Sequence, residues 1–136
     1  MLKVTCAIII KDNFILVTQR SVRMRLPLKW EFPGGKIEYG EDARKCIVRE
    51  IREELNIKIR IIDALPPVDH DYGEFQIRLI PFVATFLSGE IELKEHVQYV
   101  WLPLDELSTP DWAAADIPVM QHFLEANDAK EWCLRL

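Results

Sequence analysis

The sequence predicts an α/β fold in which a mixed β-sheet is sandwiched between helices. Two observations support this prediction. Apolar strand patterns recur along most of the chain, whereas the longer helical patterns begin far apart, near residues 42 and 116. In addition, a length of 136 residues suits one hydrophobic core, so we expect a single domain over residues 1–136.

The composition argues against several classes of protein. The net charge of -5 disfavours a nonspecific binder of nucleic-acid polymers, which would carry a basic stripe. Three widely spaced cysteines indicate small core side chains, at Cys6 and Cys46 in particular, rather than a disulfide framework or a zinc site. The apolar run at residues 6–10 is too short for a signal peptide or a membrane span. We therefore expect a cytoplasmic protein that has no membrane partner.

The first elements are predicted to be a β-hairpin and a glycine-rich turn. Strand patterns at residues 4–10 and 14–18 flank Asp12 and Asn13, which are typical turn residues. Residues 30–35 read Trp-Glu-Phe-Pro-Gly-Gly, a turn-forming stretch. Its backbone is open enough to approach a ligand or to lend a carbonyl oxygen to a metal ion.

A basic loop is predicted at residues 20–28. It contains Arg20, Arg23 and Arg25. Basic side chains beside an anion site favour phosphate contacts, although a solvated loop is the better explanation for Arg23 and Arg25.

A helix of about four turns is predicted from Asp42 onward, because no proline or glycine interrupts a four-residue apolar repeat. On this helix Glu50, Glu53 and Glu54 share one face, where like charges repel by a few tenths of a kcal/mol per pair, as a rough estimate. The end of a helix also disfavours carboxylates. A solvated acidic face is one interpretation. A divalent cation such as Mg²⁺ or Mn²⁺ would offset the repulsion and is the other. The repeat consists of Ala43, Ile47, Ile51 and Leu55.

The middle of the chain is predicted to hold a half-buried strand and a polar loop. Ile57, Ile59 and Ile61 alternate with polar residues until Pro66 and Pro67 stop the strand. Residues 68–73 are expected to form a surface loop. His70, between two aspartates, lacks the spacing of a metal site, so we interpret it as a loop residue.

Two further strands are predicted after this loop. The first spans residues 75–86, with Pro81 as a sign of a bulge or an edge strand. After a turn at Ser88 and Gly89 the pattern continues through residues 90–93, and another strand covers residues 97–102.

The C-terminal part is predicted to be helical. A short helical turn is expected at residues 103–107. Asp116 is a natural helix cap and Pro118 suits a first turn, so a second helix should begin there. Its inward residues would be Val119, Phe123 and Leu124.

The order of residues from Gly35 to Ile57 resembles the signature of the Nudix hydrolases. The one departure is Asn56, where the family has glycine, and asparagine is the best substitute where a helix ends in a left-handed conformation. The stretch from Trp30 to Glu38 is similar to that of the MutT-like branch. The matching positions are Gly35, Glu41, Arg49, Glu50, Ile51, Glu53, Glu54 and Ile57.

The resemblance implies the Nudix fold and hydrolysis of a diphosphate linkage with Mg²⁺, for which Mn²⁺ can substitute. Glu41 would support the metal site through a water or a hydrogen bond. Arg49 would orient a carboxylate by a bidentate contact. The resemblance implies that Arg49 and Glu53 are both catalytic residues. Either Glu50 or Glu95 would act as the general base. The implied metal ligands are Gly34, Gly35, Glu50, Glu53, Glu54 and Glu95.

The resemblance also implies where substrate binds. Arg20 would contact phosphates, while Phe32 and Lys36 would border the substrate. Asp116 stands where relatives contact the nucleobase, in a segment similar to that of bacterial CTP pyrophosphohydrolases. An ionised carboxylate only accepts hydrogen bonds and therefore suits an exocyclic amine such as cytosine N4. Tyr72 is a weaker indication of relatives that act on dinucleoside polyphosphates.

Three functions follow from these features. The first is a pyrophosphohydrolase that converts nucleoside triphosphates to monophosphates, with (d)CTP or modified pyrimidine nucleotides as substrates. Within it, an 8-oxo-dGTP diphosphatase that protects the nucleotide pool, and so serves DNA repair, is an alternative. The second is a Nudix enzyme for dinucleotides or nucleotide sugars, which the short chain disfavours, and the third is a nucleotide sensor without turnover, which the intact glutamate set disfavours. We expect a small nucleotide as partner and a monomer or homodimer.

Overall fold

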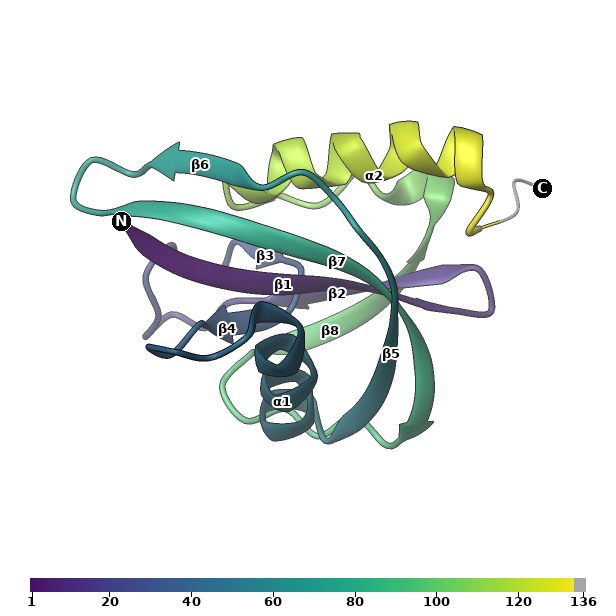
Figure 1. Cartoon of the computed structure of the whole chain (residues 1–136), viewed down its shortest axis with the longest axis horizontal. Helices are drawn as coiled ribbons and strands as arrows, with labels where there is room; N and C mark the ends of the chain where they lie inside the picture. Colours follow the sequence, from purple (N-terminus) through teal and green to yellow (C-terminus); the bar gives the residue numbers. More distant parts are fainter. Residues whose placement is uncertain (134–136) are drawn as a thin grey trace.

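The computed structural model describes residues 1–133, which form a mixed eight-stranded sheet and two α-helices (Figure 1). The main strand order is β3-β2-β1-β7-β5, with β4 paired to β1, β6 to β7 and β8 to β2. Among these pairs β1 and β7 run parallel and the others antiparallel, which confirms the mixed sheet. The elements are β1 (Leu2–Lys11), β2 (Phe14–Gln19), β3 (Trp30–Glu31), β4 (Gly34–Lys36), α1 (Ala43–Leu55), β5 (Ile57–Ala64), β6 (Val68–Asp71), β7 (Gln76–Gly89), β8 (Gln98–Pro103), a 3-10 turn (Leu104–Glu106) and α2 (Asp116–Lys130).

The sheet has a hydrophobic cluster on each face, because side chains alternate along its central strands. In β1, Ile8 and Ile10 pack with Phe123 of α2, whereas Ile9 packs with Ile47 of α1. Figure 1 shows the two helices on opposite sides of the sheet. The predicted sandwich is therefore confirmed.

The strands β1 and β2 pair only near their hairpin turn, where Ile10 faces Ile15. Asp12 and Asn13 both have positive φ, of 52° and 67°, as a tight hairpin turn requires. Beyond the hairpin the segment 30–36 fills the space between the two strands, since β3 pairs with β2 and β4 with β1. The prediction of a simple turn at residues 30–35 was therefore wrong. Its strand pairing depends on partners that are distant in sequence.

Helix α1 has the predicted ends. Asp42 is the N-cap and its side chain accepts a hydrogen bond from the backbone N–H of Arg44. Asn56 has φ 60° and donates its backbone N–H to the carbonyl of Arg52 at 3.0 Å. The left-handed conformation expected at this departure from the family pattern is confirmed.

The predicted polar loop at residues 68–73 was wrong in its first part, because residues 68–71 form β6 against β7. Val68 is buried with Leu79, which anchors the strand. Across the pair, the Arg78 guanidinium donates two hydrogen bonds to Asp69, at 2.8 and 3.0 Å. A local reading of the polar residues misses this partner strand.

Pro81 was wrongly interpreted as the sign of an edge strand or a bulge. It lies within β7, which pairs with β1 on one side. On the other side β7 changes partner at this point, from β5, whose pairing ends at Ala64, to β6. The carbonyl of Pro81 accepts the N–H of Leu65 at 3.1 Å, between the two partner strands. The register shifts occur elsewhere, between Lys58 and Ile59 and between Ile61 and Asp63.

Residues 90–93, predicted to continue a strand, lie outside any strand. Ile91 and Leu93 instead pack as half-buried side chains on the cluster beneath α1. The predicted strand at residues 97–102 and the helical turn at 103–107 are found within one or two residues of their expected bounds.

All three cysteines are free thiols, and Cys6, Cys46 and Cys133 are buried as expected for core side chains. Within residues 1–133, none of the helices is long and apolar enough to cross a membrane.

Candidate active site

A cleft of about 640 Å³ opens where β1, β4, the loop 20–28 and the start of α2 meet. One set of lining residues is acidic and comes from α1 and the loop before β8, namely Glu50, Glu54 and Glu95. A second set is largely apolar and comes from the loop 20–28, β3, β7 and their neighbours, and it includes Leu26, Phe32, Tyr72, Phe75 and Asp116. We call these the acidic set and the base set. Such a cleft is large enough for a small polar ligand.

The acidic set depends on glycine at position 35. A Cβ atom there would lie 2.4 Å from the Cδ and Oε2 atoms of Glu50, so any side chain would displace the carboxylate. Gly34 is equally constrained, because its Cβ would lie 1.9 Å from the carbonyl oxygen of Thr5 in β1. The two glycines therefore let the strand pass between β1 and the Glu50 side chain.

The surroundings of the acidic set disfavour the ionised form of its carboxyl groups on α1. Burial raises the pKa of Glu50. Burial also raises the pKa of Glu54, and repulsion from Glu95 and Glu50 adds to the effect. The Oε2 atom of Glu54 is buried and has no hydrogen-bond partner among the residues that the structure describes. A buried, unpartnered carboxylate oxygen beside other acids is a suitable ligand for a divalent cation.

The carboxylates do not yet converge as metal ligands do. Within residues 1–133 no group of three or more acidic, histidine or cysteine side chains is close enough to hold a metal ion as it stands. The donor chemistry fits a hard cation, which would draw these oxygens together.

Arg49 holds the back of the acidic set. Its Nε and one terminal nitrogen donate to the two oxygens of Glu41, at 2.8 and 3.0 Å, which is the bidentate contact that the sequence predicted. These bonds lower the pKa of Glu41 to about 2. The other terminal nitrogen lies 3.0 Å from an oxygen of Glu50 and 3.0 Å from one of Glu53.

Glu53 is the member of the predicted glutamate cluster that does not line the cleft. Its side chain is 57% exposed and contacts Arg49, whereas the Glu50 side chain is 13% exposed. The structure thus brings Glu50, Glu54 and Glu95 to the cleft and places Glu41, Arg49 and Glu53 behind them. The metal-binding and catalytic roles of Glu53 remain predictions.

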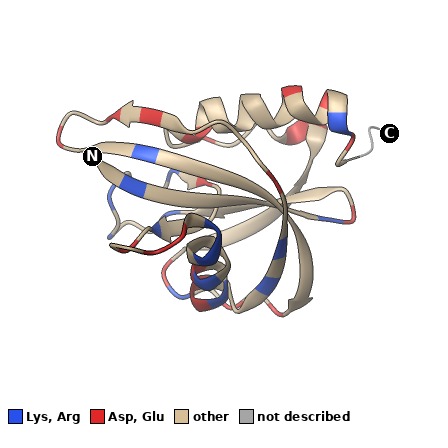
Figure 2. Ribbon diagram, in the orientation of Figure 1, with Lys and Arg blue, Asp and Glu red and all other residues tan. Residues whose placement is uncertain are grey.

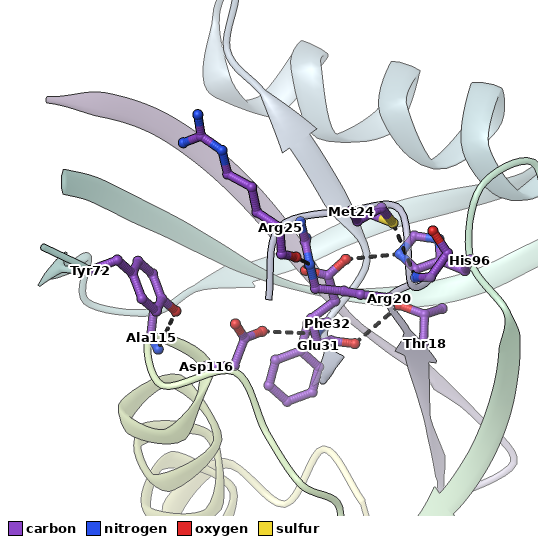
Figure 3. A network of polar contacts seen from close by, with 11 residues as sticks. Thr18, Arg20, Met24, Arg25, Glu31, Phe32, Tyr72, His96, Ala115 and Asp116 are labelled. Atoms are coloured by element: carbon purple, nitrogen blue, oxygen red, sulfur yellow. Dashed lines mark hydrogen bonds and ion pairs between the residues drawn. The ribbon is translucent and has the colours of Figure 1, made fainter. Parts of the chain in front are cut away.

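Between the two sets lies a group that the sequence analysis missed (Figure 3). Glu31 accepts a hydrogen bond from Arg20 at 2.8 Å and lies 2.8 Å from the Nε2 atom of His96. His96 is buried, and Arg20 also donates to the carbonyl of Arg25. Arg20 borders the cleft, where Glu31 holds it, and its contact with a phosphate remains a prediction. Two features of the sequence could have indicated this group. They are the charged Glu31 within the Trp30–Gly35 stretch and His96, which directly follows Glu95.

The other predicted binding residues occupy different depths of the cleft. Lys36 is exposed at its rim, whereas Phe32 is buried and its ring packs on Trp112 at 4.6 Å between centroids. Tyr72 accepts a hydrogen bond from the backbone N–H of Ala115 at 2.9 Å and stacks on Phe75. Through its hydrogen bond with Ala115, Tyr72 has a structural role at the start of α2.

Asp116 is not the helix cap that the sequence predicted. Ala115 is the N-cap residue, and Asp116 is the first residue of α2. Its Oδ2 atom instead accepts the backbone N–H of Phe32 at 2.9 Å (Figure 3). Only 6% of Asp116 is exposed, and burial together with the nearby Glu31 raises its pKa well above the usual range. The other carboxyl oxygen has no hydrogen-bond partner among the residues described.

Comparisons with known proteins agree with this architecture. A NUDIX domain profile matches residues 1–123. A "CTP pyrophosphohydrolase" from Escherichia coli (strain K12) is 32% identical over 130 residues, which are 96% of this chain and 96% of that protein. An "8-oxo-dGTP diphosphatase" from the same organism is 31% identical over 110 residues, covering 81% of this chain and 85% of that protein. The solution structure of the E. coli ORF135 protein is similar with a TM-score of 0.84 and 32% identity, covering 97% of this chain and 94% of that one.

Proposed function

The chain belongs to the NUDIX family and is a Nudix hydrolase of the MutT type, and from this premise we propose that its substrate is (d)CTP or a modified pyrimidine nucleotide. The products are the nucleoside monophosphate and pyrophosphate. The similarity to a CTP pyrophosphohydrolase over 96% of both chains supports this choice. The observation that carries it is the hydrogen bond from the backbone N–H of Phe32 to Oδ2 of Asp116, which occupies one of the two carboxyl oxygens.

Asp116 offers one acceptor to a ligand. Its Oδ2 atom is committed to the N–H of Phe32, so one carboxyl oxygen remains for substrate. When ionised, that oxygen accepts a single amine such as cytosine N4. A guanine edge would also bring its O6 acceptor, for which an ionised Asp116 has no donor. The geometry therefore supports cytosine as the base.

The cations along the cleft are suited to the triphosphate. Arg20 and Arg25 enter it from the loop 20–28 and Lys36 from β4. Arg20 keeps a fixed direction because Glu31 and the carbonyl of Arg25 hold it. A guanidinium that is held in this way contacts a phosphate at little cost in side-chain entropy.

The acidic set would hold the metal that Nudix hydrolases generally use. We propose Mg²⁺, bound by Glu50, Glu54 and Glu95 with a backbone carbonyl of Gly34 or Gly35, and with Glu53 contributing. Such an ion neutralises phosphate charge and lowers the pKa of water. Glu50 and Glu95 are the candidates for holding the proton of the attacking water, because both line the cleft. Arg49 and Glu41 keep Glu50 and Glu53 in place.

An 8-oxo-dGTP diphosphatase is the second candidate. One observation favours it besides the relative of that name: burial raises the pKa of Asp116. A protonated Asp116 is a donor as well as an acceptor and can meet the O6 atom of a guanine. This candidate would link the enzyme to nucleotide-pool protection and DNA repair.

The proposal is tested with a panel of dCTP, 5-methyl-dCTP, dGTP, dTTP and 8-oxo-dGTP in the presence of Mg²⁺. Release of pyrophosphate and of phosphate is measured separately. We expect pyrophosphate, with the highest kcat/KM for the cytosine nucleotides. A higher kcat/KM for 8-oxo-dGTP would replace the first candidate by the second, and phosphate as the main product would contradict both. Three predictions from the sequence stay open: that residues 1–136 form a single domain, that the protein is cytoplasmic, and that it is a monomer or a homodimer.

A further inference from the structure

A second concavity, of about 650 Å³, lies between α1 and β5 and contains no member of the acidic or base sets, although Arg49, which contacts Glu50, also lines it. Five consecutive residues of β5, 57–61, line it. Because neighbouring residues of a strand point to opposite faces, this groove extends around the edge of β5 and is not confined to one face. That edge is free within the described sheet, since β5 ends the strand order. We call this concavity the β5 groove.

The rim of the β5 groove is basic although the chain is acidic overall. Five exposed cations line it, and within residues 1–133 no acidic side chain does. None of the five forms an ion pair with another residue in the described part of the chain. The full sequence has a net charge of -5. Arg44 only approaches the ring of Phe82, at 5.2 Å. The five are Arg44, Lys45, Arg52, Lys58 and Arg60, and Figure 2 shows the basic bands on α1 and β5.

The floor of the groove is aliphatic. Ile57 and Ile59 are buried in the cluster beneath α1, whereas Val48 and Leu87 are 39% and 53% exposed. Exposed aliphatic side chains beside a free strand edge and five unpaired cations resemble the two halves of a peptide-binding surface. The edge supplies backbone hydrogen bonds, and the floor receives alternate side chains.

We propose that the β5 groove binds an extended, acidic segment of a partner protein, with aliphatic residues alternating with glutamate or aspartate. Charge complementarity carries the choice of partner. A second copy of this chain, related by a two-fold axis, would place the same cations against each other. A nucleic acid would lack aromatic side chains to stack on, because none lines the groove. The proposal does not depend on the substrate of the cleft.

The test uses a fluorescein-labelled peptide of alternating glutamate and valine and measures fluorescence anisotropy with the full chain. We expect saturable binding that weakens with added salt. The double variant Lys58→Glu/Arg60→Glu should lose at least about ten-fold in affinity, since two attractive contacts become repulsive. The control variant Lys3→Glu/Lys94→Glu has the same net charge and should bind nearly as well as the wild type. Equal loss in both double variants would reduce the effect to net charge and overturn the proposal.

Two further arms test the apolar floor and the choice of ligand. A peptide of alternating glutamate and serine should bind at least about five-fold more weakly, as should the glutamate-valine peptide to Leu87→Asp. Equal affinity for the two peptides would refute a role for the floor. A single-stranded oligonucleotide that displaces the peptide at lower concentration would replace the proposed partner by a nucleic acid. Unchanged hydrolase activity and thermal unfolding in the β5 variants show that they fold, because none of these residues belongs to the cleft.

Discussion

The acidic set and the base set of the cleft are built in opposite ways. Most of the acidic set comes from one continuous stretch, in which Gly35 makes room for Glu50 and Glu54 follows one helical turn later. The base set is assembled across the chain, because the contact between Phe32 and Asp116 spans 84 positions. The predicted metal ligands are thus encoded mainly by a local stretch, whereas the proposed recognition of the base depends on the tertiary fold. Changes in the two sets should therefore have separable effects.

The largest effect is expected in the acidic set. Glu54→Gln should lower kcat by at least about 10²-fold for every nucleotide, because a carboxylate that we propose as a metal ligand is lost. Glu53→Gln should also reduce turnover on this scale, through its contact with Arg49. Steady-state kinetics with dCTP and 8-oxo-dGTP provide the measurement. Near-full activity in both variants would remove Glu53 and Glu54 from the mechanism.

A second prediction for the same set concerns its glycine. Gly35→Ala should lower kcat by about 10²-fold, since the added Cβ displaces the Glu50 carboxylate. The ratio of kcat/KM between nucleotides should stay the same, because the base set is untouched. Gly73→Ala is a suitable control, as a Cβ there meets nothing within 4 Å, although its φ of 90° brings some backbone strain. A changed base preference in Gly35→Ala would show that the two sets are not separable.

Arg20 lies between the sets, and its replacement should have an intermediate effect. Arg20→Lys keeps the charge but loses the fixed geometry, so KM should rise by about ten-fold with a smaller change in kcat. Arg23→Ala, in the same loop, should change KM by less than about two-fold. Similar small effects in both variants would mean that Arg20 makes no contact with the phosphates.

The smallest effect is on stability. Because burial raises the pKa of Glu50 and Glu54, the folded state binds protons more readily than the unfolded state. Without divalent ions, the melting temperature should therefore fall as the pH rises above about 4.5, the ordinary pKa of a glutamate. Added Mg²⁺ should flatten this decline, and Glu54→Gln should reduce it. A melting temperature that rises over this range in EDTA would be the opposite of the expected sign.

Much of the fold could be predicted because its signals are local. The repeat in α1, the Asp12 and Asn13 turn and the left-handed Asn56 depend on neighbouring residues. The short strands β3, β4 and β6 could not be predicted, since their sequences are poor in strand formers and their pairing comes from β1, β2 and β7.

The same distinction holds for the cleft. Most of the acidic set was predicted from one motif, while the contact of Glu31 with His96 joins residues 65 positions apart and left no local pattern. Asp116 was placed correctly at the start of a helix, but a cap could not be distinguished from a contact to Phe32 without the fold.

The most direct test of the proposed base reading is the ratio of kcat/KM for dCTP to that for 8-oxo-dGTP, in the wild type and in Asp116→Asn. The N–H of Phe32 would hold the amide oxygen of the new side chain, which turns its NH₂ group toward the substrate. A donor then replaces the acceptor, so the ratio should fall by about 10- to 100-fold, as expected for an unpaired buried group. Glu54→Gln, which affects only the acidic set, should leave the ratio unchanged. A wild type that prefers dCTP and an Asp116→Asn variant with the same ratio would contradict the assignment of base recognition to Asp116.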